Sequence, residues 1–120
     1  MSERKSIIKE KSFSFSVRIV NLCKYLTEIK KEYILSKQLL RSGTAIGALV
    51  REAQNAESTK DFIHKLAIAQ KECDETIYWL ELLKETQYIN DPEFESIHLS
   101  AVELLKMIRS AIITTKKNNL

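Results

Sequence analysis

Turn-forming residues are almost absent from this chain of 120 residues, which contains two glycines and one proline. Tight β-turns and hairpins depend on these residue types, so a sheet of several strands would lack its connections. Helices joined by short polar loops need few of them. The sequence therefore favours an all-α fold, and a composition of 44% hydrophobic and 29% charged residues can supply one core.

Both glycines lie inside one helical pattern, which runs from Leu35 to Ala56. A glycine inside a helix costs roughly 1 kcal/mol relative to alanine, and close approach by a neighbouring helix is the usual compensation. The seam of apolar and small residues on this segment consists of Leu39, Gly43, Ile46, Val50 and Ala53. We therefore expect close helix packing at Gly43 and Gly47. A turn at residues 42–44, which would divide the segment into two short helices, is the alternative.

Apolar periodicity and capping signals predict four helices, at about residues 12–31, 36–56, 59–87 and 92–114. We expect residues 1–11 to form a mobile leader, with docking of Ile7 and Ile8 as the alternative, and we expect the tail from residue 114 to fray. The expected N-caps are Ser12 or Ser14, Ser36, Ser58 in a capping box with Asp61, and Asp91 ahead of Pro92. Because the connectors are short, consecutive helices should be antiparallel, which predicts one domain over residues 1–120 with an up-down-up-down four-helix bundle.

Each helix needs an apolar stripe for the core of this bundle. On the first helix we expect the stripe Phe13, Val17, Val20, Leu22 or Cys23, Leu26 and Ile29. On the fourth helix we expect Phe94, Ile97, Ala101, Leu104, Ile108, and Ala111 or Ile112. These spacings of three and four residues place the members of each stripe on one helix face.

The third helix has apolar residues on two faces. The core stripe consists of Phe62, Leu66, Ala69, Cys73, Ile77 and Leu80. Ile68, Trp79 and Leu82 fall on the opposite side at 100° per residue. A monomeric bundle would normally keep that side polar, so these three residues predict an oligomer interface. The alternative is that Trp79 lies across the edge of the helix in a monomer.

The sequence lacks the residue combinations that are typical of catalytic and metal-binding sites. Cys23 and Cys73 are too few for a disulfide framework or a zinc site, and no nucleophile has a histidine at a plausible spacing. A di-iron site would need the pairs Asp61/His64 and Glu95/His98 together, but antiparallel helices place them about 40 Å apart. We expect no enzyme activity, no metal and no cofactor.

Charge is distributed unevenly along the chain. Residues 1–41 hold ten Lys or Arg against four acids, residues 42–105 hold five against twelve, and residues 106–120 hold four against none. In the predicted topology the first helix begins where the fourth ends, which brings together a basic pole made of Arg4, Lys5, Lys9, Lys11, Arg109, Lys116 and Lys117. Such a pole suits a phosphate backbone or an acidic partner, and a pair of solubilising tails is the alternative.

The opposite pole should be closer to neutral. There the predicted bundle places Lys30, Lys31, Lys37 and Arg41 opposite Glu81, Glu85, Glu93 and Glu95. The N-terminus lacks the apolar run of a signal peptide, and no stretch approaches the roughly 20 apolar residues of a membrane span. We therefore expect no membrane partner and a cytoplasmic protein.

Two segments carry a family resemblance, LRSGTAIGALVREAQNAES and KDFIHKLAIAQKECDETIYWLELL. With them the chain resembles the 23S rRNA intervening sequence proteins, also called S23 ribosomal proteins, and it is more distantly similar to the accessory proteins of diversity-generating retroelements. The resemblance implies a bacterial four-helix bundle assembled as a homopentamer and encoded in some bacteria within an insertion in 23S rRNA genes. The retroelement relatives imply binding of nucleic acid and of a reverse transcriptase through basic surfaces.

Two functional hypotheses follow from the residues and the resemblance together. In the first, a homopentamer binds RNA or DNA by its basic pole as a non-catalytic accessory factor, with a reverse transcriptase or another protein as a further partner. In the second, the chain is a structural or protein-interaction module, and its basic tails have no role in binding nucleic acid. Binding that weakens steeply with salt distinguishes the first from the second.

Overall fold

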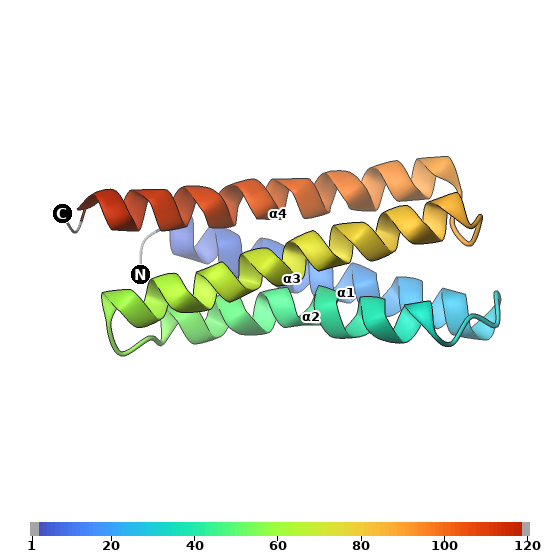
Figure 1. Cartoon of the computed structure of the whole chain (residues 1–120), viewed down its shortest axis with the longest axis horizontal. Helices are drawn as coiled ribbons and strands as arrows, with labels where there is room; N and C mark the ends of the chain where they lie inside the picture. The colour runs from blue at the N-terminus through green and yellow to red at the C-terminus, as the bar shows by residue number, and fades with distance from the viewer. Residues whose placement is uncertain (1–2, 119–120) are drawn as a thin grey trace.

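Four long helices make up the computed structural model, which describes the backbone of residues 3–118 and the side chains of residues 7–118. They are α1 (Glu3–Glu28), α2 (Leu35–Gln54), α3 (Thr59–Glu85) and α4 (Asp91–Asn118). Consecutive helices run in opposite directions, and the start of α1 lies at the same end of the bundle as the end of α4 (Figure 1). The predicted all-α four-helix bundle is therefore confirmed.

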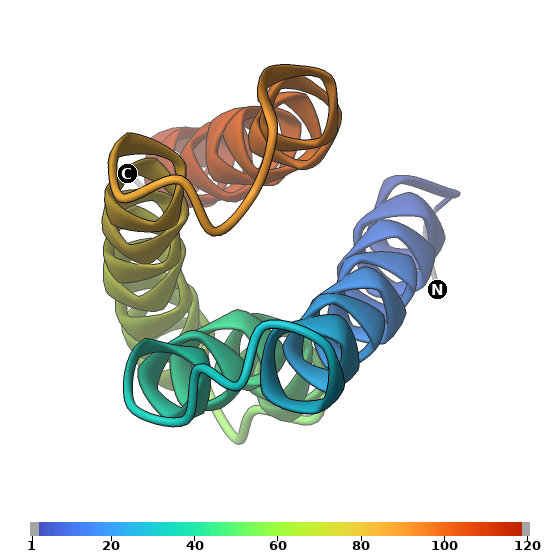
Figure 2. The same ribbon diagram turned by 90° about the vertical axis from the view of Figure 1, so that its right-hand side faces the viewer.

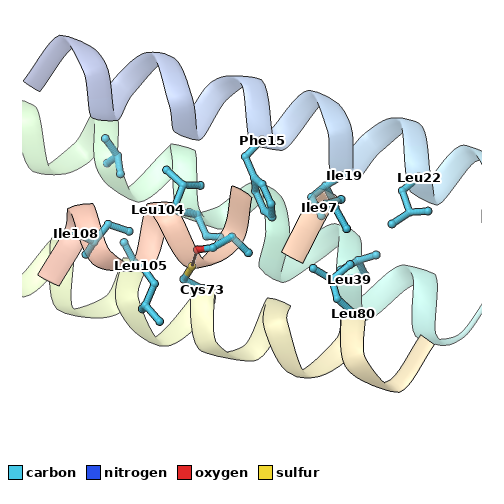
Figure 3. Close-up of a cluster of buried hydrophobic side chains, with 14 of the residues drawn as sticks. Phe15, Ile19, Leu22, Leu39, Cys73, Leu80, Ile97, Leu104, Leu105 and Ile108 are labelled. Atoms are coloured by element: carbon cyan, nitrogen blue, oxygen red, sulfur yellow. Dashed lines mark hydrogen bonds between the residues drawn. The ribbon is translucent and has the colours of Figure 1, made fainter. Parts of the chain in front are cut away.

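Viewed along the bundle axis, each helix packs beside its neighbours in sequence, whereas α1 and α4 lie further apart (Figure 2). Arg18 bridges this wider seam at the surface. Its guanidinium donates hydrogen bonds to the hydroxyl oxygens of Ser96 and Ser100, each at 3.0 Å. Inside the seam, large apolar side chains such as Phe15, Ile97 and Leu104 fill the space between the helices (Figure 3).

The helix bounds correct several expectations. Helix α1 begins at Glu3, so the prediction of a mobile leader is wrong for residues 3–11, and burial of Ile8 in the core explains why the helix starts early. Residues 1, 2, 119 and 120 lie outside the described part of the chain. Helix α2 is continuous through Gly43, which excludes the alternative turn at residues 42–44, and α4 continues to Asn118 instead of ending near residue 114.

A buried carboxylate caps α2. Neither Ser36 nor any other serine has this role, because Ile34 occupies the N-cap position without a side-chain hydrogen bond. Instead, the carboxylate of Glu32 accepts hydrogen bonds from the backbone N–H groups of Ile34, Leu35 and Ser36 at 3.1, 3.0 and 2.7 Å. Burial raises the pKa of Glu32, but these backbone hydrogen bonds outweigh it and leave the pKa below its usual value.

The remaining caps follow the sequence signals more closely. At α3 the Ser58 hydroxyl accepts a hydrogen bond from the backbone N–H of Asp61 at 3.1 Å, which confirms half of the predicted capping box. The reciprocal bond differs, because the Asp61 carboxylate accepts from the backbone N–H of Glu57 at 3.3 Å and not from that of Ser58. At α4 the cap is Asn90 and not Asp91, because the Asn90 side-chain oxygen accepts from the Glu93 N–H at 2.9 Å. Ser12 and Ser14 lie inside α1 and cap no helix.

The stripe predicted for the first helix is correct at Leu22, Cys23 and Leu26 but wrong towards both ends. Phe13, Val17 and Ile29 are 55%, 45% and 67% exposed, so the core takes a different face of α1. The buried apolar residues of α1 are Ile8, Phe15, Ile19, Leu22, Cys23 and Leu26. By contrast, every residue expected in the α4 stripe is buried.

The two glycines lie where α1 crosses α2. A Cβ atom on Gly43 would stand 2.8 Å from both Cγ1 and Cγ2 of Ile19, and one on Gly47 would stand 3.2 Å from the backbone oxygen of Ser12. Ile19 therefore occupies space that only a glycine at position 43 leaves open. Within residues 3–118, no helix combines the length and apolar character needed to cross a bilayer.

Candidate nucleic-acid interface

Two exposed lysines mark the end of α4. Lys116 and Lys117 belong to its last turn, and neither forms an ion pair within the described residues. Arg4 and Lys5 lie in the first turns of α1, at the same end of the bundle (Figure 1). Only their backbone belongs to the described part of the chain. The start of α1 and the end of α4 thus lie at the same end of the bundle, and their joint action as a basic pole stays a prediction.

The other three predicted members of the basic pole point in different directions. Lys9 lines a hollow on the outer seam between α1 and α2. Lys11 faces the α1–α4 seam, where its Nζ lies 3.8 Å from a carboxylate oxygen of Glu103. Arg109 is exposed on α4 and acts electrostatically on Cys73 of α3. These three cations are therefore separated from one another and do not form one continuous patch.

The cations of the opposite pole form few direct ion pairs within the described residues. Arg41 pairs with Glu72 at 2.8 Å and with Glu75, both on α3, and not with the acids at the end of the bundle. Hydrogen bonds from Trp79 and from Arg41 lower the pKa of Glu75. Within the described residues, the lysines of this pole, which are Lys30, Lys31 and Lys37, form no ion pair. Within residues 7–118, no direct ion pair joins them to Glu81, Glu85, Glu93 or Glu95, and the overall neutrality of this pole stays a prediction.

The thiols are buried structural groups. The Sγ atoms of Cys23 and Cys73 lie 3.3 Å from the backbone oxygens of Ser36 and Ala101, respectively, and donate weak hydrogen bonds to them. Burial raises the pKa of Cys23 to about 11 and that of Cys73 to about 12. A thiol with so high a pKa is a poor nucleophile, because the reactive form is the thiolate.

The histidines are equally remote from catalytic geometry. His64 is exposed, and the ring of His98 stacks on Phe94 with their centroids 4.9 Å apart. In the described part of the chain, no three His, Cys, Asp or Glu side chains are grouped so that they could hold a metal ion.

The comparisons with known proteins address the family. The model of the 23S rRNA-intervening sequence protein family matches residues 4–110 of the chain. The chain belongs to this family.

A solved member of the family has the same fold. It is the crystal structure of a protein of unknown function from the S23 ribosomal protein family of Bacteroides thetaiotaomicron, with 52% sequence identity and a TM-score of 0.90. The similarity covers 91% of this chain and 97% of that one. No curated protein matches the chain. The resemblance to the 23S rRNA intervening sequence family is thus confirmed, and the description of its solved member names no activity.

The apolar residues that this family member exposes differ from those expected. Ile68, Trp79 and Leu82 are half-buried within the single chain, and the Trp79 indole N–H donates to a carboxylate oxygen of Glu75 at 2.9 Å. The most exposed apolar side chain of α3 is Tyr78, which is 55% exposed and meets the Trp79 ring edge-on. The interface proposed from the sequence is therefore partly covered by the chain's own helices.

A second apolar surface was missed from the sequence. Phe13, Val17 and Leu40 lie on the outer side of α1 and α2, and they are 55%, 45% and 39% exposed. Phe13 and Val17 had been assigned to the core because α1 carries two apolar stripes. The signal in the sequence is the second apolar stripe, through Phe15 and Ile19. Because only one stripe can enter the core, the other must face outward.

Proposed function

We propose that this member of the 23S rRNA-intervening sequence family is a non-catalytic, nucleic-acid-binding accessory factor that acts as a homo-oligomer, with the pentamer of the family resemblance as the expected size. RNA is the expected ligand, and the pole at the start of α1 and the end of α4 is the expected contact. The observation that carries the proposal is the pair of exposed cations Lys116 and Lys117, neither of which forms an ion pair with another described side chain.

Nothing acidic follows Glu103 in the sequence, so the last turns of α4 present positive charge without compensation from their own helix. The carbonyl end of a helix carries the equivalent of about half a negative charge, which attracts cations. Two lysines exceed this charge and leave the helix end net positive. Such an end can meet a phosphate without first displacing a protein carboxylate, whereas Lys11 would have to leave Glu103.

Repetition within an oligomer would supply affinity that one subunit lacks. A subunit that neutralises only a few phosphates binds weakly at physiological salt, but several poles on one strand raise the effective concentration of each remaining contact. We expect binding to tolerate sequence changes in the RNA, because phosphate contacts carry no base information.

The test replaces the two lysines together, as Lys116→Glu/Lys117→Glu. Fluorescence anisotropy with a labelled RNA hairpin should show weaker binding at about 50 mM salt, and the slope of log affinity against log salt should fall by up to about two for each contacting subunit. The same number of charges is reversed at the opposite pole in the matched control, Lys30→Glu/Lys31→Glu, which should bind nearly as well as the wild type.

Equal losses in the two double variants would show that only overall charge matters. Undetectable binding of the wild type to RNA and DNA would favour the protein-interaction module instead. Light scattering of both variants is needed alongside, because a change in oligomer size would itself alter avidity.

A further inference from the structure

The outer seam between α1 and α2 forms an apolar groove with a basic rim, which we call the basic groove. Its α1 side is one helical stripe of Phe13, Val17, Val20 and Lys24, and its α2 side is another of Lys37, Leu40, Thr44, Ala48 and Arg51. Two hollows lie along it, and the side chains that line them include the cations Lys9, Lys24, Lys37 and Arg51 but no acid.

Exposure of this groove has an energetic cost in a single chain. Phe13, Val17 and Leu40 are each at least 39% exposed, and Phe13 and Leu40 line two hollows on the same seam. The guanidinium carbon of Arg51 lies 5.4 Å from the centre of the Phe13 ring, so a cation already covers one aromatic face. A contiguous apolar surface rimmed by charge is typical of a protein interface.

A surface of opposite charge lies on α3, and we call it the acidic α3 face. Asp74, Tyr78, Glu81 and Glu85 follow one another at spacings of four, three and four residues, so they share one helix stripe, and all four are exposed. Trp79 and Leu82 lie beside this stripe and are half-buried. The acidic α3 face therefore combines an exposed aromatic ring with three carboxylates.

Helix α2 lies between α1 and α3, so the basic groove and the acidic α3 face belong to different sides of the bundle (Figure 2). Lys24 and Lys37 lie near the α1–α2 connection, and Glu81 and Glu85 lie near the α3–α4 connection at the same end (Figure 1). Two copies standing side by side and pointing the same way would bring these groups to the same level.

We infer that the basic groove of one copy packs against the acidic α3 face of the next copy, head to tail. A symmetric contact between two basic grooves is disfavoured, since it would oppose four cations to four cations. Contacts between two different surfaces add copies in one direction and either close into a ring or continue as a filament. This inference rests on the homo-oligomer of the proposed function, and it names the surfaces that form it.

A charge swap tests the contact with exposed residues only, so folding should be unaffected. Lys24→Glu/Lys37→Glu should reduce the mass measured by light scattering at micromolar concentration from the oligomer toward the 13.9 kDa monomer. Glu81→Lys/Glu85→Lys should do the same. The quadruple variant with all four substitutions restores opposite charges across the contact and keeps the net charge of the wild type, and it should regain the wild-type mass.

An apolar substitution tests the floor of the groove. Val17→Glu should also dissociate the oligomer, whereas Ile113→Glu should not, because Ile113 is 63% exposed but lies outside both surfaces. Circular dichroism of each variant checks that the helices persist. If Val17→Glu unfolds, Leu40→Glu tests the groove in its place.

Three results would overturn the inference: a monomeric wild type, double variants that keep the wild-type mass, or a quadruple variant that stays dissociated. An amphipathic acidic segment of another protein would then be the better occupant of the groove. RNA binding is measured separately on the same samples. An oligomer assembled as described that binds no RNA would refute only the nucleic-acid role. A monomer that binds RNA would refute the homo-oligomer and its interface and leave the nucleic-acid role standing.

Discussion

Replacing Gly43 with alanine places a methyl group in the tightest contact between α1 and α2. The new Cβ would lie 2.8 Å from Cγ1 and from Cγ2 of Ile19, whereas non-bonded carbon atoms prefer about 3.5 to 4.0 Å. Ile19 is fully buried, so its side chain cannot swing into solvent to make room. Either the side chain leaves its preferred rotamer or the two helices move apart.

Two opposing free-energy changes decide the outcome. Alanine is better than glycine inside a helix by about 1 kcal/mol, and overpacking of a tight core typically costs about 1 to 3 kcal/mol. The difference is a net loss of up to about 2 kcal/mol in the free energy of unfolding. Leucine at the same position should be worse, since it adds volume to the same contact.

Urea unfolding followed by circular dichroism measures this difference, at one fixed protein concentration because assembly stabilises the folded chain. Gly47→Ala is the matched control. A Cβ there would lie 3.2 Å from its nearest atoms, a backbone oxygen of Ser12 and the hydroxyl of Ser16, so a smaller adjustment suffices and the stability should change less.

A double-mutant cycle identifies the cause. In an Ile19→Ala background the contacting atoms are gone, so Gly43→Ala should then stabilise the protein by about 1 kcal/mol, the value of helix propensity alone. A stabilising effect of Gly43→Ala in the wild-type chain would refute the close contact. The same change in both backgrounds would show that Ile19 is not the neighbour that matters.

Two further predictions concern the ends of helices. Glu32→Gln should lower stability at pH 7 by about 1 kcal/mol through a weaker cap on α2. It should also make stability less sensitive to acid. A carboxylate whose pKa is lowered in the folded state contributes fully to stability above its ordinary pKa of about 4.3, and this contribution is lost as pH falls through the folded-state pKa. Parallel losses of stability in the wild type and the variant from pH 7 to pH 3 would contradict this. Gln87→Gly should raise the free energy of unfolding by up to about 1 kcal/mol, because Gln87 follows the C-cap residue of α3 with φ of 67°, a conformation that glycine adopts without strain. A lower urea midpoint for this variant would show that the Gln87 side chain contributes more than the strain it causes.

The sequence predicts which cations belong to the candidate site, but it does not predict the directions in which their side chains point. Short connectors leave antiparallel helices as the solution, so the sequence predicts that the start of α1 and the end of α4 share one end of the bundle, as the structure has them. The directions of the cations were not anticipated. Lys9 and Lys11 are two residues apart and so point about 200° apart on a helix, which sends one toward α2 and the other toward α4.

The sequence by itself determined the fold class, the number of helices and the buried stripe of α4. Scarce turn residues and a single strong period along α4 leave no competing arrangement, and every residue of that stripe is buried. Local signals also located the cap at Ser58, because a capping box is formed by residues three positions apart.

Only the tertiary structure decided which face of α1 enters the core. That helix offers one stripe through Phe13 and Val17 and another through Phe15 and Ile19, and periodicity fits both. The choice depends on the helix opposite, where the missing side chain of Gly43 leaves the space that Ile19 occupies. Such complementarity between residues distant in sequence is a property of packing, and it leaves Phe13 and Val17 on the surface where we infer that another copy binds.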